Sequence, residues 1–266
     1  MLLDAPAARE WATDFLTRAT RRARKGVGHA IDLVLPPLAL DEAERPQSLG
    51  LSVRSWERIR FIDGPVCDGC GAPFEHEQGP GALCPACFAN RRSLARARAA
   101  CLYDEHSRDL ILKLKHADRT DLAPLFARWL SRAAAELLSE ADAICPVPLH
   151  PRRLLARRYN QAAEIARPLG RMSKVAYRPD ILVRTRSTPT QGGRSGRGRR
   201  ENVRGAFAVP DSAKWMVEGN RILLIDDVLT TGATGEACAK ALLKAGAAAV
   251  DLAVVARVAE SGTQPI

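Results

Sequence analysis

Two adjacent acidic residues followed by a turn of small and hydroxyl side chains form the strongest chemical signal in this sequence. An apolar run, Ile222–Ile225, leads directly into Asp226 and Asp227. The turn after them opens a segment with helical periodicity, and backbone N–H groups at a helix N-terminus attract anions. Threonine hydroxyls add donors, and a glycine lets the backbone approach a phosphate closely. The residues expected to bind a phosphate are Thr230, Thr231, Gly232, Ala233 and Thr234.

The two carboxylates complement this phosphate cradle. At the carboxyl end of a strand they would border the same crevice, where they can accept hydrogen bonds from a vicinal diol or help to hold Mg²⁺. An acid pair and a phosphate cradle at fixed spacing predict a site for a ribose 5-phosphate. The alternative is an Asp-Asp turn before a threonine-rich helix cap. A Walker-type loop is excluded, because no Gly-Lys-Ser/Thr follows a glycine-rich run.

Four cysteines form a second chemical group. Cys67 and Cys70 make one CxxC pair, and Cys84 and Cys87 make another after thirteen intervening residues. Two such knuckles complete a tetrahedral sulfur site for Zn²⁺, which leaves no open coordination position and so predicts a structural role. Two disulfides or redox pairs are the alternative. The remaining cysteines lie in apolar contexts and are expected to be buried: Cys101, Cys145 and Cys238.

A short upstream segment resembles the second knuckle. Residues 51–56 read Leu-Ser-Val-Arg-Ser-Trp, and residues 83–88 read Leu-Cys-Pro-Ala-Cys-Phe, so serines stand at both cysteine positions. One interpretation is a degenerate ribbon that has lost its metal ligands. The expected organisation is therefore an N-terminal helix and degenerate ribbon-like segment over residues 1–60, a four-cysteine zinc ribbon over 61–95, and an α/β domain over 96–260.

Apolar strands alternate with helices from about residue 101 onward. This order predicts an α/β fold with a mostly parallel sheet and flanking helices, preceded by the small cysteine module. Expected strands are 143–149, 181–183, 206–209, 221–226 and 250–258, and expected helices are 110–114, 122–138, 154–169 and 236–244, the last of these ended by Gly246.

Composition limits the class of protein. The chain has 266 residues, 46% of them hydrophobic, which excludes global disorder. Its apolar stretches fall short of the roughly 18–20 residues of a membrane span, and Met1–Asp4 gives no secretory leader, so a cytoplasmic location is expected. The formal charge of +10 comes largely from clustered arginines, which suit an anionic partner, although a GC-rich genome would also explain them.

The segment around Asp226 closely resembles the phosphoribosyl diphosphate (PRPP) signature of type I phosphoribosyltransferases, and the wider chain resembles the competence protein F (ComF) family. Three further stretches carry the family resemblance, which covers roughly residues 60–258. They are Pro146–His150 with the arginines, Asn160 and Gln161 after it; Leu112–Asp118; and Thr188, Gln191, Arg200, Asn202, Val203 and Phe207.

The resemblance implies that the turn after the first core strand holds the diphosphate of PRPP. Four arginines fall in that turn, and Arg153 and Arg157 would share one helix face. We expect Arg152 and Arg158, with Asn160, to bind the diphosphate. The alternative is a solvated basic helix face.

The resemblance also implies a flexible loop over residues 184–204 that closes over PRPP, excluding water from a ribosyl cation. Gln191 and Arg200 would meet the diphosphate there, Arg200 as a catalytic residue beside Asp226 and Asp227. A competing interpretation is an Arg/Gly nucleic-acid segment.

The implied reaction is displacement of diphosphate from PRPP by an unidentified acceptor, with Mg²⁺ assistance. Purine-salvage relatives have an aspartate where Thr230 stands, so a hypoxanthine- or guanine-type acceptor is disfavoured; His150 and His116 are candidate bases with structural roles as the alternative. A second hypothesis is a non-catalytic PRPP- or nucleotide-sensing protein that contacts single-stranded DNA or a helicase of DNA uptake.

Overall fold

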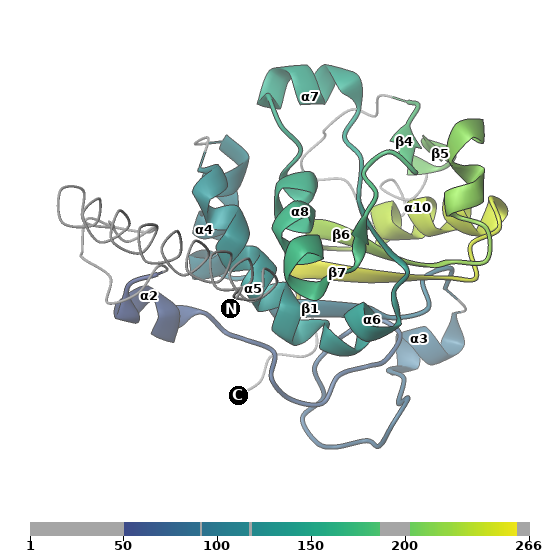
Figure 1. The fold of residues 1–266 in the computed structure, drawn as a ribbon. Coiled ribbons are helices and arrows are strands. Elements are labelled where there is room, and N and C mark those ends of the chain that lie inside the picture. The colour runs from purple at the N-terminus through teal and green to yellow at the C-terminus, as the bar shows by residue number, and fades with distance from the viewer. Residues whose placement is uncertain (1–50, 91, 117–118, 187–202, 260–266) are drawn as a thin grey trace, which may run out of the picture. The chain divides into compact units, whose positions relative to one another are not determined.

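The computed structural model of the chain describes residues 51–90, 92–116, 119–186 and 203–259 (Figure 1). The chain divides into two compact units, Met1–Trp56 and Glu57–Ile266. Of the first unit the structure describes residues 51–56, where the short helix α2 (Val53–Arg58) begins. The sheet, the cysteine ribbon and the candidate site belong to the second unit.

A five-stranded parallel sheet is the centre of the second unit. Its strand order is β1-β7-β6-β2-β3. The strands are β1 (Ala97–Leu102), β2 (Ala143–Pro146), β3 (Ala176–Tyr177), β6 (Arg221–Leu229) and β7 (Ala249–Arg257). Strands β6 and β7 lie at the centre and read as continuous apolar runs, as expected for parallel strands covered on both faces. The predicted mostly parallel sheet with flanking helices is confirmed.

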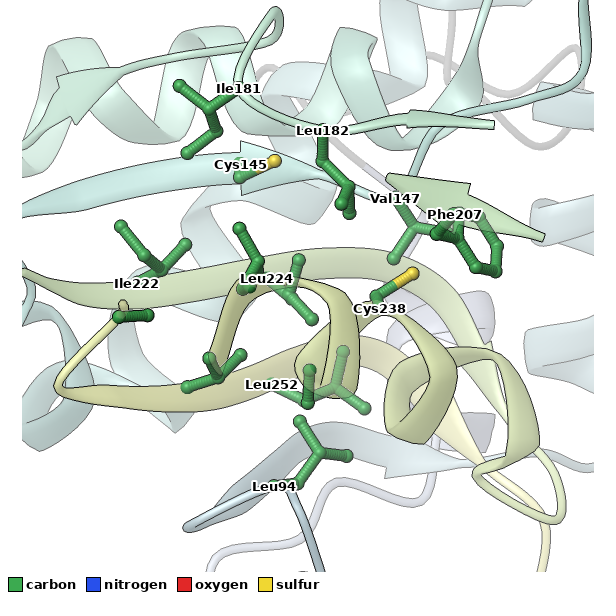
Figure 2. Close-up of a cluster of buried hydrophobic side chains, with 14 of the residues drawn as sticks. Leu94, Cys145, Val147, Ile181, Leu182, Phe207, Ile222, Leu224, Cys238 and Leu252 are labelled. Atoms are coloured by element: carbon green, nitrogen blue, oxygen red, sulfur yellow. The ribbon is translucent and has the colours of Figure 1, made fainter. Parts of the chain in front are cut away.

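Helices cover the two faces of this sheet. On one side α5 (Ala123–Ala133) packs on α8 (Gln161–Ser173), which also contacts β2 and β6. On the other side α10 (Ala233–Lys244) contacts β7. Successive side chains of a strand point to opposite faces, so Leu224 packs toward α10, in one cluster with Cys145, Cys238 and Leu252 (Figure 2).

Shorter elements complete the α/β domain. Helix α4 (Glu105–His116) follows β1, and the 3-10 turn η1 (Thr120–Leu122) and α6 (Ala135–Glu140) flank α5. A two-stranded antiparallel sheet pairs β4 (Val183–Arg184) with β5 (Phe207–Ala208) and is followed by η2 (Asp211–Met216). Both short strands fall within the predicted apolar stretches 181–183 and 206–209 or adjoin them.

The predicted helix 154–169 is wrong as one element, because the chain turns in its middle. Helix α7 (Pro151–Arg157) ends at Arg158, whose φ of 66° is left-handed and cannot continue a right-handed helix. Asn160 then caps α8, its side chain accepting the N–H of Ala162 at 3.1 Å. Helical periodicity continued across this break, so the apolar pattern alone concealed it.

Other elements match the expectations more closely. The strand expected at 250–258 is β7, the helix expected at 236–244 is α10, and Gly246 follows its end with φ 98°. Strands β1 and β3 were not predicted. Within the residues that the structure describes, no helix is long and apolar enough to cross a membrane. The N-terminal helix expected over residues 6–24 lies outside the described residues, and of the segment 1–60 the structure describes residues 51–60.

Candidate functional site

The acid pair lies where β6 leaves the interior of the sheet. Ile222–Ile225 are completely buried, whereas Asp226 and Asp227 are partly exposed at the carboxyl end of the strand. The N–H of Asp227 donates to Oδ1 of Asp226 at 2.9 Å. Lys115, near the end of α4, places its Nζ 3.0 Å from Oδ2 of Asp227. Segments more than a hundred residues apart therefore meet at this acid pair.

The electrostatics of the acid pair favour a bound cation or hydrogen-bond donor. Burial and the adjacent charge of Asp227 raise the pKa of Asp226 to about 7, although Lys115 and Arg184 oppose the shift. A partly protonated carboxyl group of this kind becomes fully ionised when donors or positive charge arrive. This donor set of two adjacent carboxylates fits Mg²⁺ or the hydroxyls of a ribose.

Residues 230–234, here called the threonine turn, connect β6 to α10. Gly232 is the N-cap of α10 with φ 75°, a left-handed conformation that glycine adopts without strain. No side chain of the described residues caps this end, so the first-turn N–H groups keep their capacity for an anion. Thr230 is exposed, and Thr231 and Thr234 are half-buried. The structure thus places the predicted phosphate residues at a helix N-terminus, as the sequence indicated.

The turn between β2 and α7 is braced by Asn160 rather than by a charge. Its Nδ2 donates to the carbonyl of Val147 at 3.0 Å while its Oδ1 caps α8. The hydroxyl of Tyr159 donates to the carbonyl of Leu114 in α4. The two hydrogen bonds of Asn160 join this turn to the start of α8, and they give Asn160 a positioning role beside the diphosphate role expected of it. His150 caps α7, since its Nδ1 accepts the N–H of Arg152 at 3.3 Å.

The arginines of α7 divide into two groups. Arg152 and Arg158, the expected diphosphate residues, are exposed. Arg153 is half-buried, and burial together with the Arg157 charge lowers its pKa. Arg184 on β4 stands 5.3 Å over the Phe207 ring, and burial and the Arg153 charge lower its pKa against the opposing charge of Asp226. Arg153 and Arg184 therefore lie within electrostatic range of each other, and Arg184 within range of Asp226.

Some predicted site residues cannot be placed. Gln191 and Arg200 fall in the segment 187–202, which lies outside the described residues. The side chain of His116 is not described either. The site residues predicted from the sequence did not include Lys115 or Arg184, and Arg153 was named there only as one of four arginines in the turn. Lys115 had a signal, because it stands in the stretch Leu112–Asp118 that resembles the family. Nothing in the sequence separates Arg153 and Arg184 from the many other arginines.

The four cysteines converge as their spacing predicted. Their sulfur atoms lie within 4.8 Å of one another, and Cys70 Sγ is 3.8 Å from Cys84 Sγ. Four sulfurs about 2.3 Å from a zinc ion would be separated by about 3.8 Å, so the cluster is compatible with structural zinc. None of these four cysteines forms a disulfide in the structure.

The cluster shifts the pKa values of its thiols in opposite directions, and burial raises the pKa of Cys70. Burial acts to raise the pKa of Cys67, but backbone N–H donors from Cys84 and Cys70 lower it to about 7, and the Cys84 N–H lies 3.2 Å from Cys67 Sγ. Burial and then the Cys70 charge raise the pKa of Cys87. Thiols this crowded cannot all ionise without a cation among them.

The two matched segments, residues 51–56 and 83–88, each have one helical backbone hydrogen bond at the equivalent position. The N–H of Trp56 donates to the carbonyl of Ser52 at 2.9 Å, and the N–H of Phe88 donates to that of Cys84 at 2.9 Å. Each bond opens a short helix, α2 in one case and α3 (Pro85–Ala89) in the other. The degenerate repeat stays a prediction that this likeness supports.

The parallel sheet and the acid pair with its turn define the class as a phosphoribosyltransferase-type domain. The family model Pribosyltran, described as phosphoribosyl transferase domain, matches residues 160–265. A glutamine phosphoribosylpyrophosphate amidotransferase from B. subtilis is 19% identical, with a TM-score of 0.37 over 54% of this chain and 30% of that one.

Curated relatives identify the family. DNA utilization protein YhgH of Escherichia coli (strain K12) is 32% identical over 200 residues, 73% of this chain and 85% of the relative. Competence protein F of Haemophilus influenzae is 30% identical over 219 residues, 75% of this chain and 93% of the relative. The chain belongs to the ComF (competence protein F) family.

Proposed function

We propose that this protein binds PRPP or a related ribose phosphate at the end of β6 and acts as a Mg²⁺-assisted phosphoribosyltransferase toward an unidentified acceptor. One observation carries the proposal: the acid pair and the threonine turn lie at the same end of β6, and only Val228 and Leu229 separate them in the chain. The turn would take the 5-phosphate, and Asp226 and Asp227 would accept hydrogen bonds from the ribose hydroxyls.

The diphosphate would lie toward the arginines. Arg153 and Arg184 are half-buried and repel each other, and a bound polyanion relieves that repulsion. Arg152, Arg158, Gln191 and Arg200 remain further candidates from the sequence. Positive charge held in place before the reaction stabilises the leaving group more than mobile solvent does.

The proposed step is a substitution at C1 of the ribose. The C1–O bond to diphosphate breaks with its electron pair leaving on the diphosphate, and the acceptor forms the new bond to C1 and loses a proton to solvent or to an unidentified base. Mg²⁺, when bound with PRPP, supplies neutralising charge to the diphosphate, and Asp226 is the carboxylate placed to hold it or the ribose. Thr230 offers no general base at neutral pH, which disfavours a purine-type acceptor.

Calorimetry with PRPP and Mg²⁺, followed by diphosphate-release assays with a panel of acceptors, tests the proposal. Asp226→Asn and Asp227→Asn should each weaken PRPP binding about tenfold or more, because a hydrogen bond to a charged group contributes about 1.5–3 kcal/mol. Asp211→Asn, in the exposed η2 turn, is the matched control and should bind normally. Absence of PRPP binding to the unaltered protein at millimolar Mg²⁺ would refute both the enzyme and the sensor.

For the cysteine cluster we propose one structural Zn²⁺ held by Cys67, Cys70, Cys84 and Cys87. Such a site contributes directly to folding of a small module that has little apolar core of its own. Thiol ligands of this kind persist in a reducing compartment, and we therefore infer a cytoplasmic location.

A second candidate function is a non-catalytic PRPP sensor that contacts single-stranded DNA or a DNA-uptake helicase. Exposed Arg152 and Arg158 on one side of the site, together with the relatives' names in DNA utilization and competence, favour it. PRPP binding without diphosphate release would support the sensor. Binding of single-stranded DNA that weakens steeply with salt would support the contact, and no binding at low salt would exclude it.

A further inference from the structure

One end of the threonine turn is tied to the first cysteine knuckle. Arg257, at the end of β7, is 3% exposed, and its guanidinium donates to the carbonyl of Cys70 at 2.7 Å and lies 3.7 Å from Cys70 Sγ. The next residue, Val258, donates its N–H to the carbonyl of Leu229 at 2.9 Å. Leu229 is the last residue of β6 before the turn. Two consecutive residues thus join a zinc-ligand position to the start of the turn.

The other end of the turn is tied to the segment that follows the second knuckle. The N–H of Ser93 donates to Oε2 of Glu236 in the first turn of α10 at 2.8 Å. A side chain built on Gly232 would lie 3.7 Å from the Arg92 guanidinium, and one on Gly235 would lie 3.1 Å from Leu94. Residues 92–94 therefore pack directly against the N-terminus of α10, five to seven residues after Cys87.

Metal binding would set the stiffness of both links. A zinc ion with four thiolates carries a net charge of −2, which favours a buried cation such as Arg257 beside it. Without the ion the two knuckles lose the coordination bonds that would join them, and a small ribbon loses the interaction that closes it. Both anchors of the turn then become mobile, and an anion site that must be ordered on binding has lower affinity.

We propose that the cysteine ribbon positions the threonine turn through Arg257 and residues 92–94, so that zinc binding at the cysteines and PRPP binding at the turn strengthen each other. This inference rests on the proposed function, since it takes PRPP as the ligand of the turn. Arg257 is a positioning residue, because it contacts Cys70 and reaches the turn only through Val258 and Leu229. It would not touch PRPP itself. Coupling between two sites is reciprocal, so each ligand must change the affinity of the other by the same factor.

The first experiment measures that factor in the full chain. PRPP affinity is measured by calorimetry with Mg²⁺ before and after zinc removal, and zinc affinity is measured with a zinc-selective chromogenic chelator with and without PRPP. We expect both affinities to change by the same factor, about fivefold or more. PRPP binding that is equal in both metal states, with unchanged zinc affinity, would overturn the coupling and leave the proposed function standing. Failure of the zinc-loaded protein to bind PRPP would refute the proposed function as well.

The second experiment keeps zinc in place, because zinc removal also loosens the ribbon itself. Arg257→Lys and Glu236→Ala each weaken one link, and Arg128→Gln on the exposed side of α5 is the matched control. At full zinc content and unchanged circular dichroism, we expect the two variants to bind PRPP several-fold more weakly and to show a smaller zinc–PRPP coupling factor than the control. Unchanged affinity and coupling in Glu236→Ala, which alters a half-buried side chain, would overturn the proposal even where Arg257→Lys fails to fold.

Discussion

Nζ of Lys115 lies 3.0 Å from Oδ2 of Asp227, and this ion pair joins the last turn of α4 to the end of β6. Both side chains are largely buried, with 19% and 15% of their side-chain surface exposed. The pair balances one of two adjacent negative charges, which leaves Asp226 as the carboxyl group whose pKa is raised to about 7 by burial and by Asp227. Asp227 is thereby held in one orientation at the edge of the candidate site.

Lys115→Met is expected to weaken PRPP binding about tenfold. Without the ammonium group Asp227 loses its orientation, and a second uncompensated charge faces an anionic ligand. A hydrogen bond to a charged group contributes about 1.5–3 kcal/mol, and a loss of about 1.4 kcal/mol weakens the affinity tenfold. Calorimetry with Mg²⁺ measures the effect. Lys214→Met removes an exposed lysine paired with Asp211 and should leave binding unchanged; equal affinities in both variants would contradict the role given to Lys115.

Arg153 and Arg152 provide a matched pair of variants on one helix. Arg153 is half-buried near Arg184, and Arg152 is exposed. We expect Arg153→Gln to lower PRPP affinity at least fivefold more than Arg152→Gln, since solvent and salt screen the contact of a half-buried charge with phosphate less than that of an exposed one. Titrations at two salt concentrations check this. A larger loss of affinity in Arg152→Gln would contradict this and favour the exposed arginines, Arg152 and Arg158, as the diphosphate-binding residues.

Gly232→Ala should lower the free energy of unfolding by about 1–2 kcal/mol, because an alanine at φ 75° is strained. Space is not the cause, since the nearest atom to the added Cβ is Leu229 Cδ1 at 3.6 Å. Urea denaturation measures the loss. Gly64→Ala, in open space without a positive φ, is the control and should change stability by less than about 0.5 kcal/mol. Equal stability of the two variants would show that the turn relaxes.

Zinc content tests the ribbon directly. Protein purified without chelator should carry about one zinc per chain, and Cys70→Ser should lose it, because three thiolates do not complete the structural site. Cys101→Ser, at a buried cysteine whose thiol donates to the Val255 carbonyl, should retain the metal. Elemental analysis gives the count. Two equivalents per chain would contradict the degenerate upstream ribbon.

Asp251→Ala should be the most destabilising of these variants. Asp251, near the amino-terminal end of β7, has 1% of its side chain exposed. Its Oδ2 forms ion pairs with the guanidinium groups of Arg221 at 2.7 Å and Arg96 at 3.3 Å. Removing one partner of a buried ion pair costs about 3–5 kcal/mol, whereas Asp211→Ala, beside exposed Lys214, should cost little. Urea denaturation separates the two. Similar unfolding midpoints would show that Glu140, which also contacts Arg96 and Arg221, holds this cluster alone.

The sequence predicted those features whose residues lie close together in the chain. The paired CxxC knuckles, the acid pair and the threonine turn all lie within short segments, and residue type and spacing determine their geometry. The break at Arg158 shows the limit, since an apolar stripe with helical spacing runs through α7 and α8. The left-handed backbone of Arg158 and the cap by Asn160, seen only in the structure, separate the two helices.

The sequence alone predicted a parallel α/β domain, a four-thiol cluster and an acid pair followed by a threonine turn at the end of a strand. The tertiary structure decided which distant charges act on the acid pair: of forty basic residues, Lys115 pairs with Asp227, and Lys115 and Arg184 both oppose the raised pKa of Asp226. It also decided that both cysteine knuckles reach the threonine turn, through Arg257 and through Ser93. Contacts between segments this far apart depend on how helices and strands pack, and no local spacing records that.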